Sequence, residues 1–142
     1  MRFLEKSKPQ PPSCTAQSPP ATAAKGTTRE RGNAAEDKAL AFLNQAGLQL
    51  VARNYRTPGR GGGEIDLVMR ERDGTLVFVE VRSRASSAFG GAGGSIGAAK
   101  RQRIVHAARH YLMRLSTPPP CRFDVVLVED SVQWIQAAFD AQ

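Results

Sequence analysis

The chain is poor in cysteine and has no long apolar run, and each shortage excludes a class of protein. Cys14 and Cys121 are its two cysteines among 142 residues. Two cysteines are too few for a disulfide framework, so we expect free thiols in a reducing cytosol. No apolar stretch approaches the roughly 20 residues that cross a bilayer. Residues 1–6 lead into Ser and Pro rather than into a signal-peptide core. These absences predict a cytoplasmic protein without a membrane partner.

Acidic residues are also in short supply. Thirteen Asp and Glu stand against twenty Lys and Arg, which gives a net charge of +7. Residues 1–28 contain four of the basic residues and one of the acids, so residues 29–142 keep a net charge of +4. This balance favours a polyanionic partner.

The chain divides into a tail and a body. Residues 1–28 hold five of the nine prolines, with Ser, Thr, Ala and Gln between them. Such a stretch cannot bury enough apolar surface to offset its ordering entropy, so we expect disorder. Residues 29–142 are long enough for one hydrophobic core and too short for a two-domain enzyme. We therefore predict a single domain behind a disordered tail.

Hydrophobic periodicity in the body predicts a helix, three strands, a helix and a strand. The expected helices span residues 33–46 and about 96–115, and the expected strands span 48–54, 64–71, 75–84 and 122–129, with 132–135 as a short final candidate. Gly47 and the prolines at 118–120 end the helices. The second helix should bury Ile96, Ala99, Ile104, Ala107, Ala108, Tyr111 and Leu115. The order indicates an α/β domain with a mixed sheet.

The turn between the second and third strands sets their register. A three-residue loop of Arg72, Asp73 and Gly74 puts glycine where a left-handed residue is required. That loop pairs Glu71 with Thr75. A two-residue loop would shift the pairing by one and turn the side chains of both strands to the wrong faces. We therefore predict the three-residue loop.

In this register two acids face each other. Asp66 lies opposite Glu80, and Glu64 lies opposite Arg82. Directly opposed like charges destabilise a sheet. A hard divalent cation with oxygen ligands between the two carboxylates would relieve the repulsion. The alternative is a solvated face on which Glu64 pairs with Arg82 and a neighbouring base such as Arg84 neutralises the rest.

Several strings of the body resemble one protein family. In chain order they are Gly32…Ala35-Glu36…Ala39, Arg53-Asn54-Tyr55-Arg56, Gly63-Glu64-Ile65-Asp66-Leu67, Val77-Phe78-Val79-Glu80-Val81-Arg82-Ser83-Arg84, Lys100…Ile104…Ala108…Tyr111-Leu112, Arg122-Phe123-Asp124-Val125-Val126 and Ala138-Phe139. Over about residues 30–140 the chain resembles the YraN-like uncharacterised protein family. That family is similar in turn to the restriction-endonuclease-like nuclease superfamily, which includes archaeal Holliday-junction resolvases and is marked by an Asp, a gap and Glu-x-Lys.

The resemblance implies a restriction-endonuclease-like fold and a metal-dependent endonuclease that acts on DNA, including branched DNA. Asp66 and Glu80 would hold Mg²⁺ or Mn²⁺, with the Val81 carbonyl as a further ligand. Glu36 matches an extra acid that some superfamily members contribute. The metal would polarise a phosphodiester and help to generate hydroxide from water. Cutting both strands of a junction needs two sites, which favours a homodimer.

One position departs from the superfamily pattern. Arg82 stands where the lysine is expected, and arginine stays protonated and cannot act as a base. It can still stabilise charge that develops on a phosphate, and Lys100 is a candidate substitute for the lysine. The alternative function is therefore a nucleic-acid-binding module with a degenerate nuclease site. A third candidate function is that of an interaction protein whose proline-rich tail docks a partner.

Basic residues form a stripe on the second helix. Arg103, His106, His110 and Arg114 are spaced by three, four and four, and Lys100 and Arg101 extend the stripe at its start. We predict contacts with a phosphate backbone through Lys100, Arg101, Arg103 and Arg84, contacts that weaken with salt. The alternative is an ordinary solvated helix face.

The remaining polar and glycine-rich features have structural interpretations. We expect the glycine clusters at 59–63 and 90–94 to be mobile loops that flank the site. Asp124 should pair with Arg122, and Trp134 should pack in the core or at an edge. Cys121 has no catalytic partner and should be a small buried residue.

Overall fold

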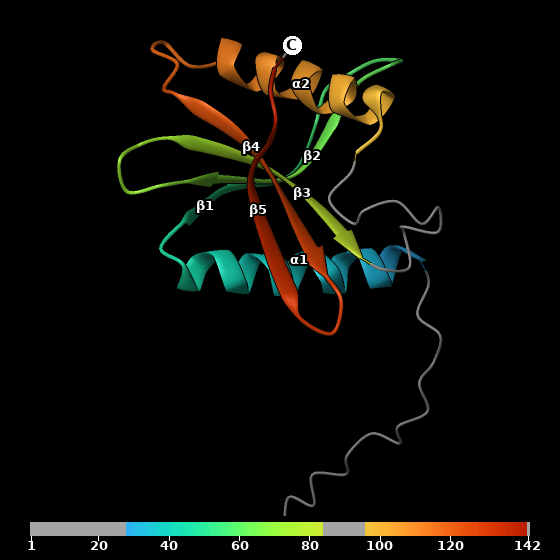
Figure 1. Ribbon diagram of the computed structural model, residues 1–142. Coiled ribbons are helices and arrows are strands. Elements are labelled where there is room, and N and C mark those ends of the chain that lie inside the picture. The colour runs from blue at the N-terminus through green and yellow to red at the C-terminus, as the bar shows by residue number, and fades with distance from the viewer. Residues whose placement is uncertain (1–27, 84–95, 142) are drawn as a thin grey trace, which may run out of the picture.

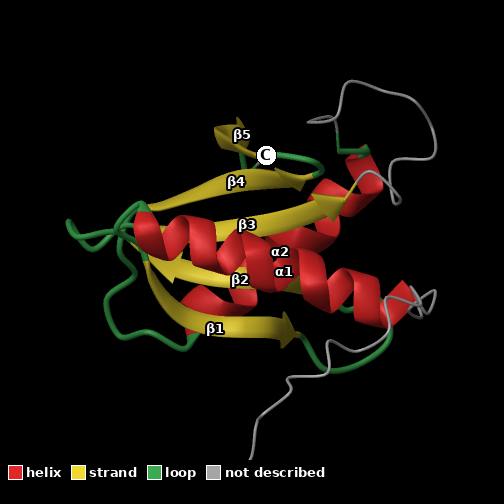
Figure 2. Ribbon diagram, turned by 90° about the horizontal axis from the view of Figure 1, so that it is seen from below, coloured by secondary structure: helices red, strands yellow, loops and turns green. Residues whose placement is uncertain are grey.

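The computed structural model describes residues 28–83 and 96–141, which form one sheet between two helices (Figure 1). In chain order the elements are α1 (Thr28–Gln45), β1 (Gln49–Arg56), β2 (Glu64–Arg70), β3 (Leu76–Ser83), α2 (Ala98–Met113), β4 (Cys121–Val128) and β5 (Val132–Phe139). Viewed from below, α1 crosses one face of the sheet and α2 lies behind it (Figure 2). The α/β class is confirmed.

The sheet is mixed, as the order of its elements predicts. Its strands lie in the order β1-β2-β3-β4-β5. β3 and β4 are parallel, whereas β1–β2, β2–β3 and β4–β5 are antiparallel. A parallel pair requires a crossover, and the crossover between β3 and β4 contains α2. β5 runs to Phe139, beyond the short strand expected to end at residue 135, so two strands follow the second helix.

Both faces of the inner strands are buried, which explains the near-continuous apolar runs of β3 and β4. On the α1 face, Ala39 and Leu43 pack over Leu67, Val77 and other side chains of the inner strands. On the α2 face, the buried helix residues Ile104, Val105, Ala107 and Ala108 join a cluster that contains Val68, Phe78, Phe123 and Val125. The two cores hold the central strands rigidly in place.

The β2–β3 hairpin has the predicted register. Glu71 N–H donates to the Thr75 carbonyl at 2.9 Å, and Gly74 adopts a φ of +93°. The paired residues run from Arg70–Leu76 to Leu67–Val79. The predicted register, which puts the side chains of Asp66 and Glu80 on the same face of the sheet, is therefore confirmed.

Three local predictions are wrong. Ala99 is exposed, because the buried residues of α2 begin only at Ile104, and Val105 is buried although the predicted stripe omits it. Cys121 is exposed, since it is the first residue of β4 and precedes the buried run. α1 begins at Thr28 rather than at residue 33, whereas Gly47 ends it as expected, with a φ of +103°.

Both outer strands are irregular. The β1 register shifts between Leu50 and Ala52, and Asn54 adopts a left-handed φ of 53°. The β4–β5 register shifts between Phe123 and Val125, and Ala137 in β5 has a φ of 50°. Such bulges bend a strand and leave residues out of the ladder.

Some predictions concern residues outside the described part of the chain. The disorder expected for residues 1–28 falls there except for Thr28, as do Arg84 and the glycine cluster at 90–94. Within the described residues, neither helix combines the length and apolar character of a membrane span.

Candidate active site

The paired residues of β2 and β3 end at Leu67 and Val79, just before Asp66. Beyond this point the Asp66 side chain, rather than a backbone carbonyl, accepts a hydrogen bond from β3. Val81 N–H donates to Asp66 Oδ2 at 2.9 Å. The hydrogen bond fixes the direction of the carboxylate at the open end of the hairpin. The register thus brings Asp66 and Glu80 together, and they form what we call the acid pair.

Glu80 is the more deeply buried member of the acid pair. Its side chain is 9% exposed, and Oε1 lies 3.3 Å from Lys100 Nζ on α2. Oε2 is buried and receives no hydrogen bond from an N–H or hydroxyl group of the described residues; the carboxyl group that interacts with Glu80 is that of Asp66. Almost all buried polar groups in native structures are hydrogen-bonded, so this oxygen marks a place that can accept a ligand.

Burial and mutual repulsion make the acid pair hard to ionise. Burial raises the pKa of Glu80 to about 8, the charge of Asp66 acts in the same direction, and Lys100 opposes both. Burial also raises the pKa of Asp66, while the hydrogen bond from Val81 lowers it. The pair therefore retains a proton near neutral pH unless another cation takes the proton's place.

Glu36 on α1 is also buried, with partners of its own. Its Oε2 accepts from Arg53 Nε at 3.2 Å and from Asn54 Nδ2 at 3.3 Å. Successive strand side chains normally point to opposite faces, and the left-handed Asn54 lets both reach one oxygen. Burial raises the pKa of Glu36, and the charge of Asp66 raises it further. Glu36 is thus electrostatically coupled to the acid pair.

The acid pair fits a hard cation through two carboxylates. Within the described ranges, no three His, Cys, Asp or Glu side chains form a metal-binding group. Mg²⁺ does not need one, because it is usually bound by one or two carboxylates together with water and substrate phosphates. Glu80 Oε2, which receives no hydrogen bond from an N–H or hydroxyl group of these residues, suits that mode. The role of Glu36 as a third ligand stays a prediction.

The predicted basic residues fall into two groups. Lys100 reaches the acid pair, as its contact with Glu80 shows. Arg101 donates to the Ile96 carbonyl at 2.9 Å and braces the start of α2. Arg103 is exposed, and Arg82 is half-buried on β3, two residues beyond Glu80. Their roles in phosphate binding stay predictions.

At the far end of the helical stripe, His110 and Arg114 contact Tyr55 of β1. His110 Nδ1 and the Tyr55 hydroxyl lie 2.6 Å apart, and the Arg114 guanidinium lies 5.9 Å from the centre of the Tyr55 ring. These contacts tie α2 to the edge strand. Along the stripe Arg103, His106 and Arg114 are exposed, whereas His110 is half-buried.

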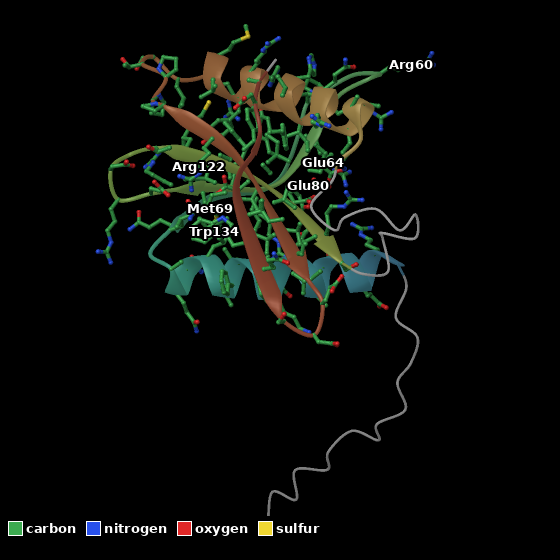
Figure 3. The ribbon with its side chains drawn as sticks, viewed as in Figure 1. Arg60, Glu64, Met69, Glu80, Arg122 and Trp134 are labelled. Carbon is green, nitrogen blue, oxygen red and sulfur yellow. The ribbon has the colours of Figure 1, made fainter. Side chains whose placement is uncertain are left out.

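Asp124 is a structural residue, as the sequence suggests. It is fully buried and accepts from Arg122 Nε at 2.8 Å, from Trp134 Nε1 at 2.8 Å and from Ala137 N–H at 2.9 Å. Its carboxylate therefore joins β4 to β5 at the point where their register shifts. Figure 3 shows Arg122 and Trp134 well apart from Glu80.

Gly63 is a residue whose importance the sequence analysis missed. A Cβ at this position would collide with the Arg103 carbonyl, so β2 begins in direct backbone contact with α2. Gly63 N–H also donates to Thr57 Oγ1 at 2.7 Å. Two sequence signals include it, the end of a glycine cluster that we interpreted as a mobile loop and the start of the family string Gly63-Glu64-Ile65-Asp66-Leu67, and neither indicates this contact.

The fold and site define a small α/β protein with a mixed sheet and a buried acid pair beside a helix-borne lysine. The chain belongs to the Uncharacterised protein family UPF0102, whose model matches residues 35–128. A UPF0102 protein of Paracidovorax citrulli is 75% identical over 124 residues, which cover 87% of this chain and 92% of that protein. One of Verminephrobacter eiseniae is 68% identical over 144 residues and spans all of both chains. The family resemblance is confirmed, and the similarity to the nuclease superfamily stays a prediction.

Proposed function

We propose that this protein is a metal-dependent endonuclease that hydrolyses phosphodiester bonds in DNA. The observation that carries the proposal is Glu80 Oε2, a buried oxygen of an acid that interacts with a second acid, Asp66, and that receives no hydrogen bond from an N–H or hydroxyl group of the described residues. Leaving a buried acceptor unpaired costs about 1–3 kcal/mol. Either a proton shared with Asp66 or a cation between the two carboxylates removes that cost, so the acid pair can exchange its proton for a metal ion.

Asp66 and Glu80 would hold Mg²⁺ or Mn²⁺, with the Val81 carbonyl as a further ligand. Such an ion, when bound, polarises a phosphodiester and lowers the pKa of a bound water. The Val81 N–H orients Asp66 for this task. Glu36 on α1 lies close enough to Asp66 for their charges to interact, so it would add negative charge near the proposed cation.

Two basic residues would act on the phosphate. Lys100 Nζ lies 3.3 Å from Glu80 Oε1, so its positive charge stands beside the acid pair. Arg82 cannot serve as a base, but a guanidinium can stabilise the charge that develops on the phosphate. Lys100 therefore takes the place of the lysine that the nuclease pattern expects at Arg82.

One observation favours the alternative, a DNA-binding module without catalysis. Arg82 occupies the lysine position, and Lys100 is already engaged with Glu80. This alternative predicts salt-dependent DNA binding that persists in EDTA, with no product even in Mn²⁺. The net charge of +4 on residues 29–142 supports DNA binding under either function.

Cleavage of fluorescent single-stranded, duplex and four-way-junction DNA in Mg²⁺, Mn²⁺ or EDTA tests the proposal. We expect metal-dependent product with the wild type and none with Asp66→Asn. Asp130→Asn removes an exposed acid from the β4–β5 turn and is the matched control. Binding without product in any metal would refute the enzyme and support the alternative.

Calorimetric titration with Mn²⁺ tests the metal site independently of cleavage. We expect heat of binding from the wild type and from Asp130→Asn, and none from Asp66→Asn. Equal heats from all three proteins would place the metal elsewhere and refute the role of the acid pair.

A further inference from the structure

The loop of residues 57–63 projects from the end of the sheet that carries the acid pair, and we call it the β1–β2 loop. Its base is closed by Thr57 N–H, which donates to the Gly63 carbonyl at 3.0 Å, and by Gly63 N–H, which donates to Thr57 Oγ1 at 2.7 Å. Gly63 also lies directly against the backbone of Arg103. The base of the loop is therefore fixed to both β2 and α2.

The apex of the loop presents Arg60 to solvent. Gly59 and Gly61 flank it with φ values of +91° and +73°, and a Cβ at either glycine would meet nothing within 4 Å. These glycines serve the turn rather than packing, and they leave room for another molecule to approach the backbone. Figure 3 shows Arg60 projecting beyond the body near the start of α2, with Glu64 and Glu80 below it.

Arg60 and Arg103 differ from the other bases at this end of the molecule. Both are exposed, and no hydrogen bond or ion pair joins either guanidinium group to another described residue. The neighbouring bases are engaged: Arg56 with Glu64 at 3.3 Å, Lys100 with Glu80 at 3.3 Å and Arg101 with the Ile96 carbonyl at 2.9 Å. Two uncommitted guanidinium groups thus lie on either side of the contact between Gly63 and α2.

The spacing suits a nucleic-acid backbone. Gly63, the residue just before β2, precedes Asp66 by three residues, which corresponds to about 10 Å along an extended chain. Each strand of duplex DNA carries a phosphate about every 3.4 Å of helix axis. A duplex with one phosphodiester at the acid pair would therefore bring phosphates a few nucleotides away to Arg60 and Arg103.

We propose that the β1–β2 loop is a DNA-binding arm, in which Arg60, together with Arg103 of α2, contacts phosphates that flank the bond held at the acid pair. This inference rests on the proposed function and assigns a substrate-binding role to Arg60. The arm binds by charge without reading bases, so its contribution weakens with salt.

Fluorescence anisotropy of a labelled DNA duplex, measured in EDTA over a series of salt concentrations, tests the arm in the full-length chain. Arg60→Ala should weaken binding by about fivefold to tenfold at 0.1 M salt and reduce the salt slope by about 0.9, the contribution of one phosphate contact. Arg60→Lys should retain most of the slope. Arg70→Ala, at the opposite end of β2, is the matched control and should bind as the wild type does.

The outcomes separate the two proposals. If the wild type binds the duplex and Arg60→Ala binds equally well with the same salt slope, the arm is refuted while the proposed function stands. If Arg60→Ala and Arg70→Ala weaken binding alike, the effect is one of net charge and the arm is again refuted. If the wild type does not bind the duplex in EDTA, the arm is refuted, because it binds by charge without a metal ion, and the proposed function is then decided by the cleavage assay and the Mn²⁺ titration.

Discussion

Replacing Glu80 by glutamine should stabilise the metal-free protein at neutral pH. Glutamine keeps the size of the side chain and its acceptor for Lys100 but cannot ionise. In the unfolded chain Glu80 has its ordinary pKa of 4.5, whereas burial in the folded protein raises the pKa to about 8. Each unit of this difference is worth about 1.4 kcal/mol. At pH 7.5 the ionisation of Glu80 therefore lowers the free energy of unfolding of the wild type by about 4 kcal/mol, and the variant has no such loss.

The sign of the pH dependence follows from the raised pKa. The folded state binds the Glu80 proton more tightly than the unfolded state does. The contribution of this proton to stability is complete below pH 4.5 and is lost as the pH rises toward about 8. The free energy of unfolding of the wild type should fall across this interval. Glu80→Gln should show a flatter profile.

Urea unfolding in EDTA at several pH values between 5 and 8 is the assay. With a slope of about 2 kcal/mol/M, the expected difference at pH 7.5 moves the midpoint by about 2 M. Glu129→Gln, an exposed position in the β4–β5 turn, is the control and should leave the wild-type profile unchanged. A Glu80→Gln variant that is less stable than the wild type at pH 7.5, or that keeps its pH slope, would refute the reasoning.

Two further predictions concern the framework around the site. Gly63→Ala should lower the free energy of unfolding by about 1–3 kcal/mol, because its Cβ collides with the Arg103 carbonyl; an unchanged urea midpoint would contradict this close contact. Asp124→Asn should cost about 3–5 kcal/mol, because it removes a buried ion-pair partner from Arg122. Trp134, the chain's one tryptophan, donates to Asp124, so its fluorescence should change as well; an unperturbed spectrum with wild-type stability would argue against this role.

The sequence predicts the acid pair because local chemistry determines the hairpin. Gly74 supplies the left-handed residue that the three-residue loop requires, and the alternation of β2 and β3 rejects the two-residue loop, which would shift the register by one. These two constraints suffice to place Asp66 opposite Glu80. The hydrogen bond from Val81 is not predictable in the same way, because it depends on where the ladder ends.

Contacts between distant elements escape sequence reasoning. The pairing of Lys100 with Glu80 depends on how α2 lies across the sheet, and periodicity gives only the face of a helix. Glu36 was identified by resemblance, but its bonds to Arg53 and Asn54 require a left-handed residue inside a strand. Propensity rules assign that conformation to turns.

The irregular outer strands bear on how two copies of this protein could associate. An exposed, regular edge strand invites pairing with a second sheet, and bulges on the edge oppose it. Here Asn54 distorts one edge and Ala137 distorts the other. A continuous intermolecular sheet would have to straighten one of these strands and, at β1, separate Asn54 from Glu36. A homodimer of the kind that junction cleavage favours would therefore associate through helices or loops, with the two sheets remaining separate.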